Sequence, residues 1–169
     1  PPVDIVIFEG WCWGVEPQLT SQLQTPVNGF ESDQDPSGVW RQYINRQIEQ
    51  GYQPLYALMD HWIMLKAPGF ENVFNWRLEQ EQKLAATTTG EGRHIMSEQE
   101  VSRFIAYYQR LTEHCIETLP DRCDTVFELA DDRSIVVNNE NCVANTDHIV
   151  VRHNREDDSI VLSFQNNRL

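Results

Sequence analysis

The chain has 169 residues, of which 40% are hydrophobic and 10% aromatic, and its formal net charge at pH 7 is −13. This length suits one domain with its own core, and the composition is that of a globular rather than a disordered protein. The acidity argues against nonspecific binding to nucleic acid or to an anionic membrane, because both require basic surface. A phosphorylated ligand remains compatible with it, since a few local arginines suffice to bind one.

The apolar runs and the cysteine spacing do not indicate a membrane-spanning, secreted or metal-binding protein. No apolar run approaches the roughly 20 residues of a membrane span, and no signal peptide is visible. The four cysteines, Cys12, Cys115, Cys123 and Cys142, lack the close-paired spacing of a metal site. A disulfide framework is not expected in a domain with this much core, so we expect reduced, mostly buried thiols in a cytoplasmic protein.

The first third of the chain predicts one strand and two helices. Residues 3–8 are an apolar run without alternation, which is typical of a central parallel strand buried on both faces. Residues 16–24 predict a short helix with Pro17 in its first turn. After a polar loop, apolar residues recur at helical spacing over about residues 38–50, and Gly51 predicts the end of that helix.

The middle of the chain predicts a strand between helices. Residues 55–66 are ambiguous but favour a strand near their end, and residues 70–86 predict a helix. Residues 87–95 are expected to form a loop. Ser97 and Glu100 form a capping-box pattern that opens an amphipathic helix, which ends at Pro120.

The last part of the chain predicts short strands. Residues 123–129 predict a strand, and Asp131-Asp132 predicts a turn after it. His148–His153 and Ser159–Phe164 predict a hairpin around residues 155–158. Strands that alternate with helices indicate an α/β domain with a largely parallel sheet.

Glu9 is the first candidate for chemistry, because it ends the predicted central strand. Ligands bind outside the carboxyl ends of parallel strands, where an acid can hold a hydrated Mg²⁺ in phosphoryl transfer. Gly10, the next residue, lets backbone and ligand come close. The structural alternative is an acid that caps the next helix. Trp11 or Trp13 offers a further platform for a nucleobase or sugar, or is simply pocket wall.

Arg77 is the second candidate, because it falls on or beside the apolar stripe of its predicted helix, where an unpaired charge is costly. Either it pairs with an internal acid such as Glu81 one turn on, or it faces a cleft where phosphate arrives. Arg93, in a glycine-bracketed loop before a capped helix, either moves toward a ligand or is a solvated loop arginine.

Five sequence blocks, taken in order, resemble the C-terminal half of the D-glycerate 3-kinase-like P-loop kinases. These kinases are grouped with uridine kinase, pantothenate kinase and phosphoribulokinase. The blocks are DIVIFEGWCWGVEPQ, PVNGFESDQDPSGVWRQYIN, YQPLYALMDHWIMLKAPGFENVFNWRLEQEQKL, IMSEQEVSRFIAYYQRLTEH and LPDRCDTVFELADDRSI. The resemblance covers about residues 1–135 and leaves a β-rich extension, residues 136–169, without a counterpart.

The resemblance implies a fold and a set of roles. The fold would be a three-layer P-loop NTPase-like parallel sheet, here incomplete, with a lid over about residues 77–97. Glu9 would sit beside Mg²⁺ and the transferring phosphoryl group, and Arg77 would contact phosphate at the base of the lid. Gly10 and Trp11 would shape the pocket for an alcohol acceptor such as glycerate. Lys83 and Arg93 would be further lid cations, and the cofactors would be ATP and Mg²⁺.

The family's glycine-rich GxxxxGK[ST] phosphate loop does not occur in these 169 residues. We therefore expect the chain to be the C-terminal half of a longer kinase, to need that protein's N-terminal half as its partner, and to be inactive alone. An inactive binding or regulatory module on a kinase scaffold is the alternative. A metal-dependent, phosphatase-like hydrolase built on Glu9 is a third possibility.

Overall fold

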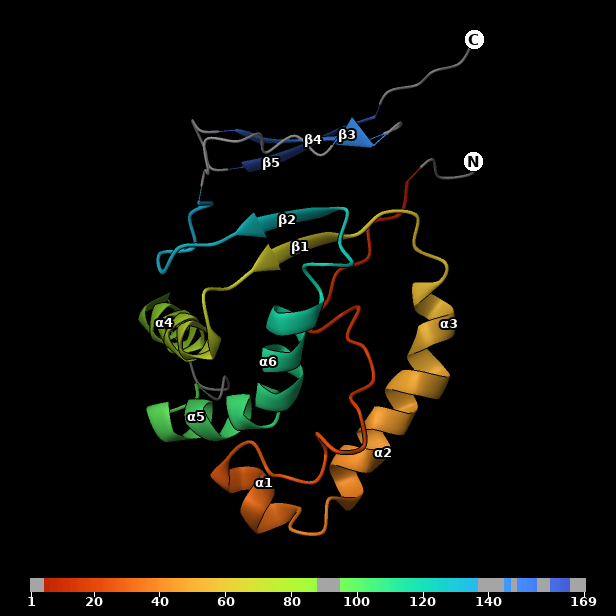
Figure 1. Cartoon of the computed structure of the whole chain (residues 1–169). Coiled ribbons are helices and arrows are strands. Elements are labelled where there is room, and N and C mark those ends of the chain that lie inside the picture. Colours follow the sequence, from red (N-terminus) through yellow and green to blue (C-terminus); the bar gives the residue numbers. More distant parts are fainter. Residues whose placement is uncertain (1–4, 88–94, 137–144, 147–148, 155–158, 165–169) are drawn as a thin grey trace.

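The computed structural model describes residues 5–87, 95–136, 145–146, 149–154 and 159–164. This part of the chain is a mixed α/β structure, as the alternation of strand and helix patterns predicts. Figure 1 shows a pair of strands, β1 and β2, with helices on one side and a second small sheet on the other. In chain order the elements are α1 (Gly29–Gln34), α2 (Val39–Gln47), the π-helical turn η1 (Ile48–Tyr52), α3 (Gln53–Tyr56), β1 (Ile63–Lys66), α4 (Phe70–Thr87), α5 (Glu98–Ala106), α6 (Gln109–Thr118), β2 (Thr125–Glu128), β3 (Asn145–Thr146), β4 (Ile149–Asn154) and β5 (Ser159–Phe164).

The β1–β2 pair confirms the strands expected near the end of residues 55–66 and over residues 123–129. The strands are parallel, with Ile63 opposite Thr125 and Lys66 opposite Glu128. Parallel strands need a long crossover, and α4, α5 and α6 provide it. Phe127 is 1% exposed, so β2 supplies one of the two most completely buried side chains of the described residues.

The helices of the crossover also follow the sequence. The helix predicted over residues 70–86 is α4. Ser97 caps α5 as expected: Glu100 N donates to the Ser97 hydroxyl, and Ser97 N donates to the Glu100 carboxylate at 2.8 Å. The single helix expected after this cap is broken at Tyr107–Tyr108, so that α5 and α6 are separate helices.

Three local predictions are wrong. Residues 5–8 form no strand, and the side chains from Ile5 to Phe8 are 48–75% exposed, because no other described segment pairs with them. The short helix expected over residues 16–24 is instead an irregular segment with a turn at residues 20–23. Gly51 does not end its helix: η1 widens the helix there, and α3 continues it to Tyr56.

Two buried arginines explain the irregular segment. Arg110, 6% exposed, binds the Glu31 carboxylate through both Nε and Nη2 and donates to the backbone oxygens of Gln22 and Thr25. Arg41, 5% exposed, pairs with Asp35 and donates to the Leu23 oxygen. These bonds replace the intrahelical hydrogen bonds that a regular helix would provide.

The core and the tail complete the fold. The core gathers around α6, where Val15, Ile48, Cys115 and Leu119 are buried together. The predicted hairpin is confirmed: β4 and β5 are antiparallel, with Asn154 opposite Ser159. The division into a kinase portion, 1–135, and an extension, 136–169, stays a prediction. In the described part of the chain, no helix has the length and apolar character to cross a membrane.

Candidate functional site

A cavity of about 1440 Å³ lies between the N-terminal segment, the strand β1 and the helices α4 and α6. Its lining includes five of the six predicted site residues: Glu9, Gly10, Trp11, Arg77 and Lys83. The sixth, Arg93, lies outside the described residues. Glu9 and Lys83, which are 74 positions apart in the sequence, therefore line the same space.

A tight turn at residues 10–14 forms one side of the cavity. Trp13 N donates to Gly10 O at 3.1 Å, and Val15 N donates to Cys12 O at 3.2 Å. Gly14 has φ +93°, and a Cβ there would lie 2.8 Å from the Trp62 ring, so only glycine fits. Cys12 also has a positive φ, 58°, which is uncommon for a residue with a side chain.

Trp11 is anchored to α6 at the edge of the cavity. Its Nε1 donates to the Thr112 hydroxyl at 2.9 Å, and its ring stacks on Tyr108 with centroids 5.1 Å apart. The residue is still 46% exposed. A fixed aromatic ring with an open face suits the wall of a pocket for a small ligand.

Glu9 stands immediately before this turn and is exposed. Its carboxylate forms no ion pair with any other described residue, so its charge is available to the cavity. Among the described residues, no three His, Cys, Asp or Glu side chains gather into a metal-binding group. A single carboxylate fits a hydrated Mg²⁺, which keeps several of its waters, better than it fits a fully protein-ligated ion.

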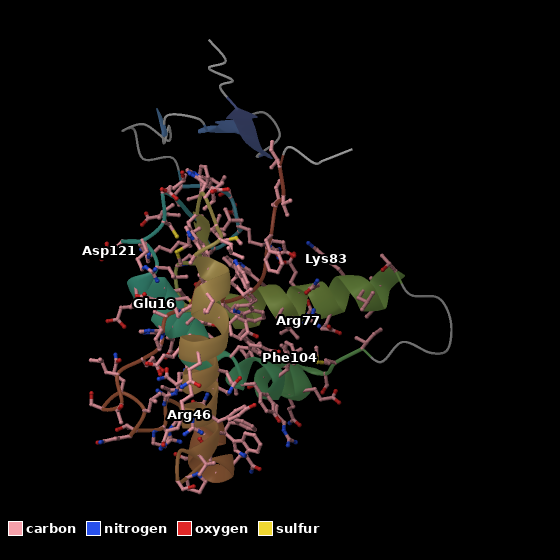
Figure 2. The ribbon with its side chains drawn as sticks, turned by 90° about the vertical axis from the view of Figure 1, so that its right-hand side faces the viewer. Glu16, Arg46, Arg77, Lys83, Phe104 and Asp121 are labelled. Carbon is pink, nitrogen blue, oxygen red and sulfur yellow. The ribbon has the colours of Figure 1, made fainter. Side chains whose placement is uncertain are left out.

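Arg77 lies on α4 and joins several groups. Its guanidinium forms an ion pair with Glu81 and a hydrogen bond with Gln80, and it lies 5.6 Å from the ring centroid of Phe104 on α5. Figure 2 shows Arg77 above Phe104, where the two helices run one over the other. The side chain of Glu81 is only 4% exposed and that of Arg77 is 24% exposed. The pairing with Glu81 that the helix spacing allowed is thus present, while Arg77 also borders the cavity.

Glu81 links this pair to the next helix. Its Oε2 accepts a hydrogen bond from Met96 N at 2.9 Å, just before the cap of α5. One buried carboxylate therefore joins α4 to the start of α5 and holds Arg77 in place.

Lys83 and Arg133 share one carboxylate at the cavity edge. Lys83 Nζ lies 2.5 Å from Glu79, and Arg133 pairs with the same Glu79. Figure 2 shows Lys83 on α4, the helix that also carries Arg77. The hydrogen bond from Lys83 lowers the pKa of Glu79 against the opposing effect of desolvation, and the Arg133 charge lowers it further. Two cations with one anion leave a surplus of positive charge beside the cavity.

Arg133 is the residue that sequence reasoning missed. It follows β2 in a turn where Arg133 N donates to Ala130 O at 2.9 Å and Ala130 N donates to Ser134 O at 2.8 Å. Its φ is 73°, and its guanidinium lies 6.0 Å from the ring of Trp76. The available signal was its position just after a predicted parallel strand, at the end of the sheet where ligands bind.

The basic and acidic side chains of the cavity therefore come from different segments of the chain. The described lining contains three basic side chains, Arg77, Lys83 and Arg133, and two acidic ones, Glu9 and Asp60. The cations come from α4 and the turn after β2, whereas Glu9 comes from the N-terminal segment. In a chain with a net charge of −13, this cation-rich wall is a local exception that suits an anionic ligand.

Comparison with known proteins indicates a kinase-related chain. Over 131 residues it is 30% identical to the uncharacterized kinase mug58 of Schizosaccharomyces pombe, a match that covers 69% of this chain and 44% of the relative. The chain thus spans less than half the length of this curated relative. No protein-family model matches the chain, and no solved structure matches it.

Proposed function

We propose that the chain is the C-terminal part of an ATP- and Mg²⁺-dependent kinase that phosphorylates a small hydroxylated metabolite such as glycerate. The main support is a single cavity whose lining contains Glu9, which forms no ion pair with another described residue, together with three cations, Arg77, Lys83 and Arg133. The similarity to a protein named as a kinase supports it.

The cationic wall is suited to bind the phosphates of the nucleotide. Arg77, Lys83 and Arg133 would replace their contacts with Glu79 and Glu81, in whole or in part, by contacts with phosphate oxygens. An arginine offers two parallel donors to a phosphate, whereas a lysine acts as a point charge. In phosphoryl transfer the protein contributes mainly positioning and charge neutralisation, and this wall would provide both.

The N-terminal segment of the cavity lining is suited to the metal and the acceptor. Glu9 would hold Mg²⁺ through water, and the ion would neutralise charge on the phosphates. Gly10 leaves room for close approach of a ligand, and the Trp11 ring, fixed by Thr112, would form one wall of the acceptor pocket. The acceptor hydroxyl would then lie between Glu9 and the cations.

The proposed fold is an incomplete P-loop NTPase-like sheet with a lid over about residues 77–97, of which residues 88–94 lie outside the described part of the chain. The exposed apolar side chains from Ile5 to Phe8 support this proposal, because they match a strand that pairs only when another segment is present. An N-terminal half of the same protein would provide that segment, together with the phosphate loop and its lysine. The relative's greater length is consistent with such a partner.

The test uses a longer protein that contains these 169 residues together with the segment encoded upstream of Pro1. Purified protein is assayed for ADP formation with MgATP, with and without glycerate and other small alcohols. Kinase function predicts ADP formation that depends on the acceptor. ATP binding without turnover would favour the regulatory module, and phosphate release from a phosphoester without ATP would favour the hydrolase. The 169-residue chain alone is expected to turn over no ATP.

A further inference from the structure

Three cysteines from distant parts of the sequence converge on the wall of the cavity. Cys12 lies in the turn at residues 10–14, Cys115 lies on α6, and Cys123 precedes β2. All three line the cavity and pack in the same core cluster. They form no disulfide with one another, and the fourth cysteine, Cys142, lies outside the described residues.

Cys12 packs against the core cluster that contains Cys115, and each thiol shifts the pKa of the other, in opposite directions. The hydrogen bond from the Cys115 thiol lowers the pKa of Cys12; burial opposes this change, and Thr112 adds to it. The same hydrogen bond, together with burial, raises the pKa of Cys115. Cys12 is also the more exposed of the two, so an oxidant reaches it more easily, and a thiolate reacts with oxidants much faster than a thiol; Cys12 is therefore the reactive member of the pair.

Thr112 contacts the Cys12 thiol on the face of α6 that also carries Cys115. Its hydroxyl lies 3.6 Å from Cys12 Sγ and accepts the hydrogen bond from Trp11 Nε1. Thr112 and Cys115 are three residues apart on α6, so their side chains share a face of the helix. The left-handed backbone of Cys12, φ 58°, directs its side chain from the turn toward that face. Such strained residues concentrate where a protein has a functional requirement.

We propose that Cys12 and Cys115 are a redox modification site, at which a hydroperoxide converts the two thiols into an intramolecular disulfide. The disulfide ties the turn that carries Trp11 to α6. The site is independent of the proposed kinase function, because it depends only on the two thiols and on access through the cavity.

The chemistry needs one hydroperoxide and two thiols. The Cys12 thiolate attacks one peroxide oxygen, the O–O bond breaks, and the leaving hydroxide takes up a proton to become water (or an alcohol from an organic hydroperoxide). The product is a sulfenic acid at Cys12. Cys115 then loses its proton as its sulfur attacks the Cys12 sulfur, the S–O bond breaks, and a second molecule leaves as water. Two electrons pass from the two sulfurs to the peroxide.

Cys123 is the competing partner for Cys115, since the two lie close enough to interact electrostatically. Burial and the Asp124 charge raise the pKa of Cys123, so it supplies little thiolate. We therefore expect the Cys12–Cys115 bond to form first.

The sequence allows a direct test, because trypsin cleavage places each cysteine in a different peptide: residues 1–41, 111–122, 123–133 and 134–152.

The experiment treats the folded, reduced chain with one equivalent of hydrogen peroxide. Remaining thiols are blocked with N-ethylmaleimide, and the chain is digested without reductant and analysed by mass spectrometry. The expected result is a loss of two thiols per chain and a linked pair of peptides 1–41 and 111–122, which dithiothreitol separates. Cys12→Ser and Cys115→Ser should each abolish the link, whereas Cys123→Ser and Cys142→Ser should leave it intact.

Several results would overturn the proposal. A link between peptides 111–122 and 123–133, a link between two chains, or oxidation of Cys12 to sulfinic acid without a link would each show that Cys115 does not resolve Cys12. The same digestion after oxidation in guanidinium chloride reveals the pairing of an unfolded chain. If the folded and unfolded chains give the same mixture of links, the fold does not direct the reaction.

Discussion

Replacement of Arg77 by alanine is the perturbation whose effect the structure defines best. The change leaves the Glu81 carboxylate, 4% exposed, without its cation, although the hydrogen bond from Met96 N remains. Breaking a fully buried ion pair costs about 3–5 kcal/mol, and breaking an exposed one costs about 0.2–1 kcal/mol. Because the Arg77 side chain is 24% exposed, we expect a loss of about 2–3 kcal/mol in the free energy of unfolding.

The resemblance alone leads to a different expectation, in which Arg77 waits unpaired for phosphate and its loss costs activity but little stability. The buried partner changes that expectation: both stability and phosphate binding should fall. Arg77→Lys should recover much of the stability, since it keeps the charge, but not the binding, since it lacks the planar pair of donors.

The assay is urea unfolding followed by tryptophan fluorescence, on Arg77→Ala, Glu81→Gln and the double variant. The double variant should be less destabilised than the sum of the single changes, with a coupling energy of at least about 1 kcal/mol. Matched binding measurements with inorganic pyrophosphate complete the set, because Glu81→Gln frees Arg77 and should strengthen binding. A midpoint for Arg77→Ala that is unchanged within error, together with additive single changes, would refute the reasoning.

Three further predictions concern other parts of the structure. Glu79→Gln should strengthen pyrophosphate binding several-fold, because it frees the two cations Lys83 and Arg133. Glu16→Gln makes the same charge change away from the cavity and should not strengthen binding. Equal effects of the two variants in titration calorimetry would mean that only net charge matters. Gly14→Ala should lower the free energy of unfolding by about 1–3 kcal/mol, since φ +93° strains a side chain that also meets the Trp62 ring; an unchanged urea midpoint would contradict this. Burial raises the pKa of Asp35, but backbone N–H groups and the Arg41 guanidinium outweigh it and lower the pKa overall. The unfolded chain therefore binds more protons than the folded chain, and the stability that Asp35 contributes near neutral pH should be lost as the pH falls below roughly 4. If Asp35→Asn loses the same amount of stability at acid pH as the wild type, another group is responsible for that loss.

The parts of the fold that local patterns specify were predictable from the sequence. Helix α4, the Ser97 cap and the β4–β5 hairpin depend on periodicity, a short-range hydrogen-bond pattern and turn residues. Strands β1 and β2 were found because β-forming residues stand between helix breakers. These signals all lie within about 20 residues of the elements that they define.

The parts that long-range contacts specify were not predictable. The segment at residues 5–8 looks like a strand by composition, but a strand also needs a neighbour, and no described segment pairs with it. The irregular path before α1 depends on Arg110, about 80 residues away, which no local pattern reveals. Within the site, Glu9, Trp11, Arg77 and Lys83 were named from the sequence and share one cavity. The shared carboxylate of Glu79 and the role of Arg133 became visible only in three dimensions.

The proposal of a phosphoryl-transfer site rests on Glu9 and on the cations that line the same cavity. Its most direct test compares wild type with Glu9→Gln in the longer protein, where acceptor-dependent ADP formation and nucleotide affinity are measured on the same preparations. We expect Glu9→Gln to lower kcat by about a hundredfold or more while the free energy of unfolding and the Kd for ATP change little, because the amide keeps the shape of the side chain but removes the charge that would face Mg²⁺. Wild-type turnover in the variant, or a parallel loss of nucleotide binding and stability, would contradict it and make Glu9 a structural residue.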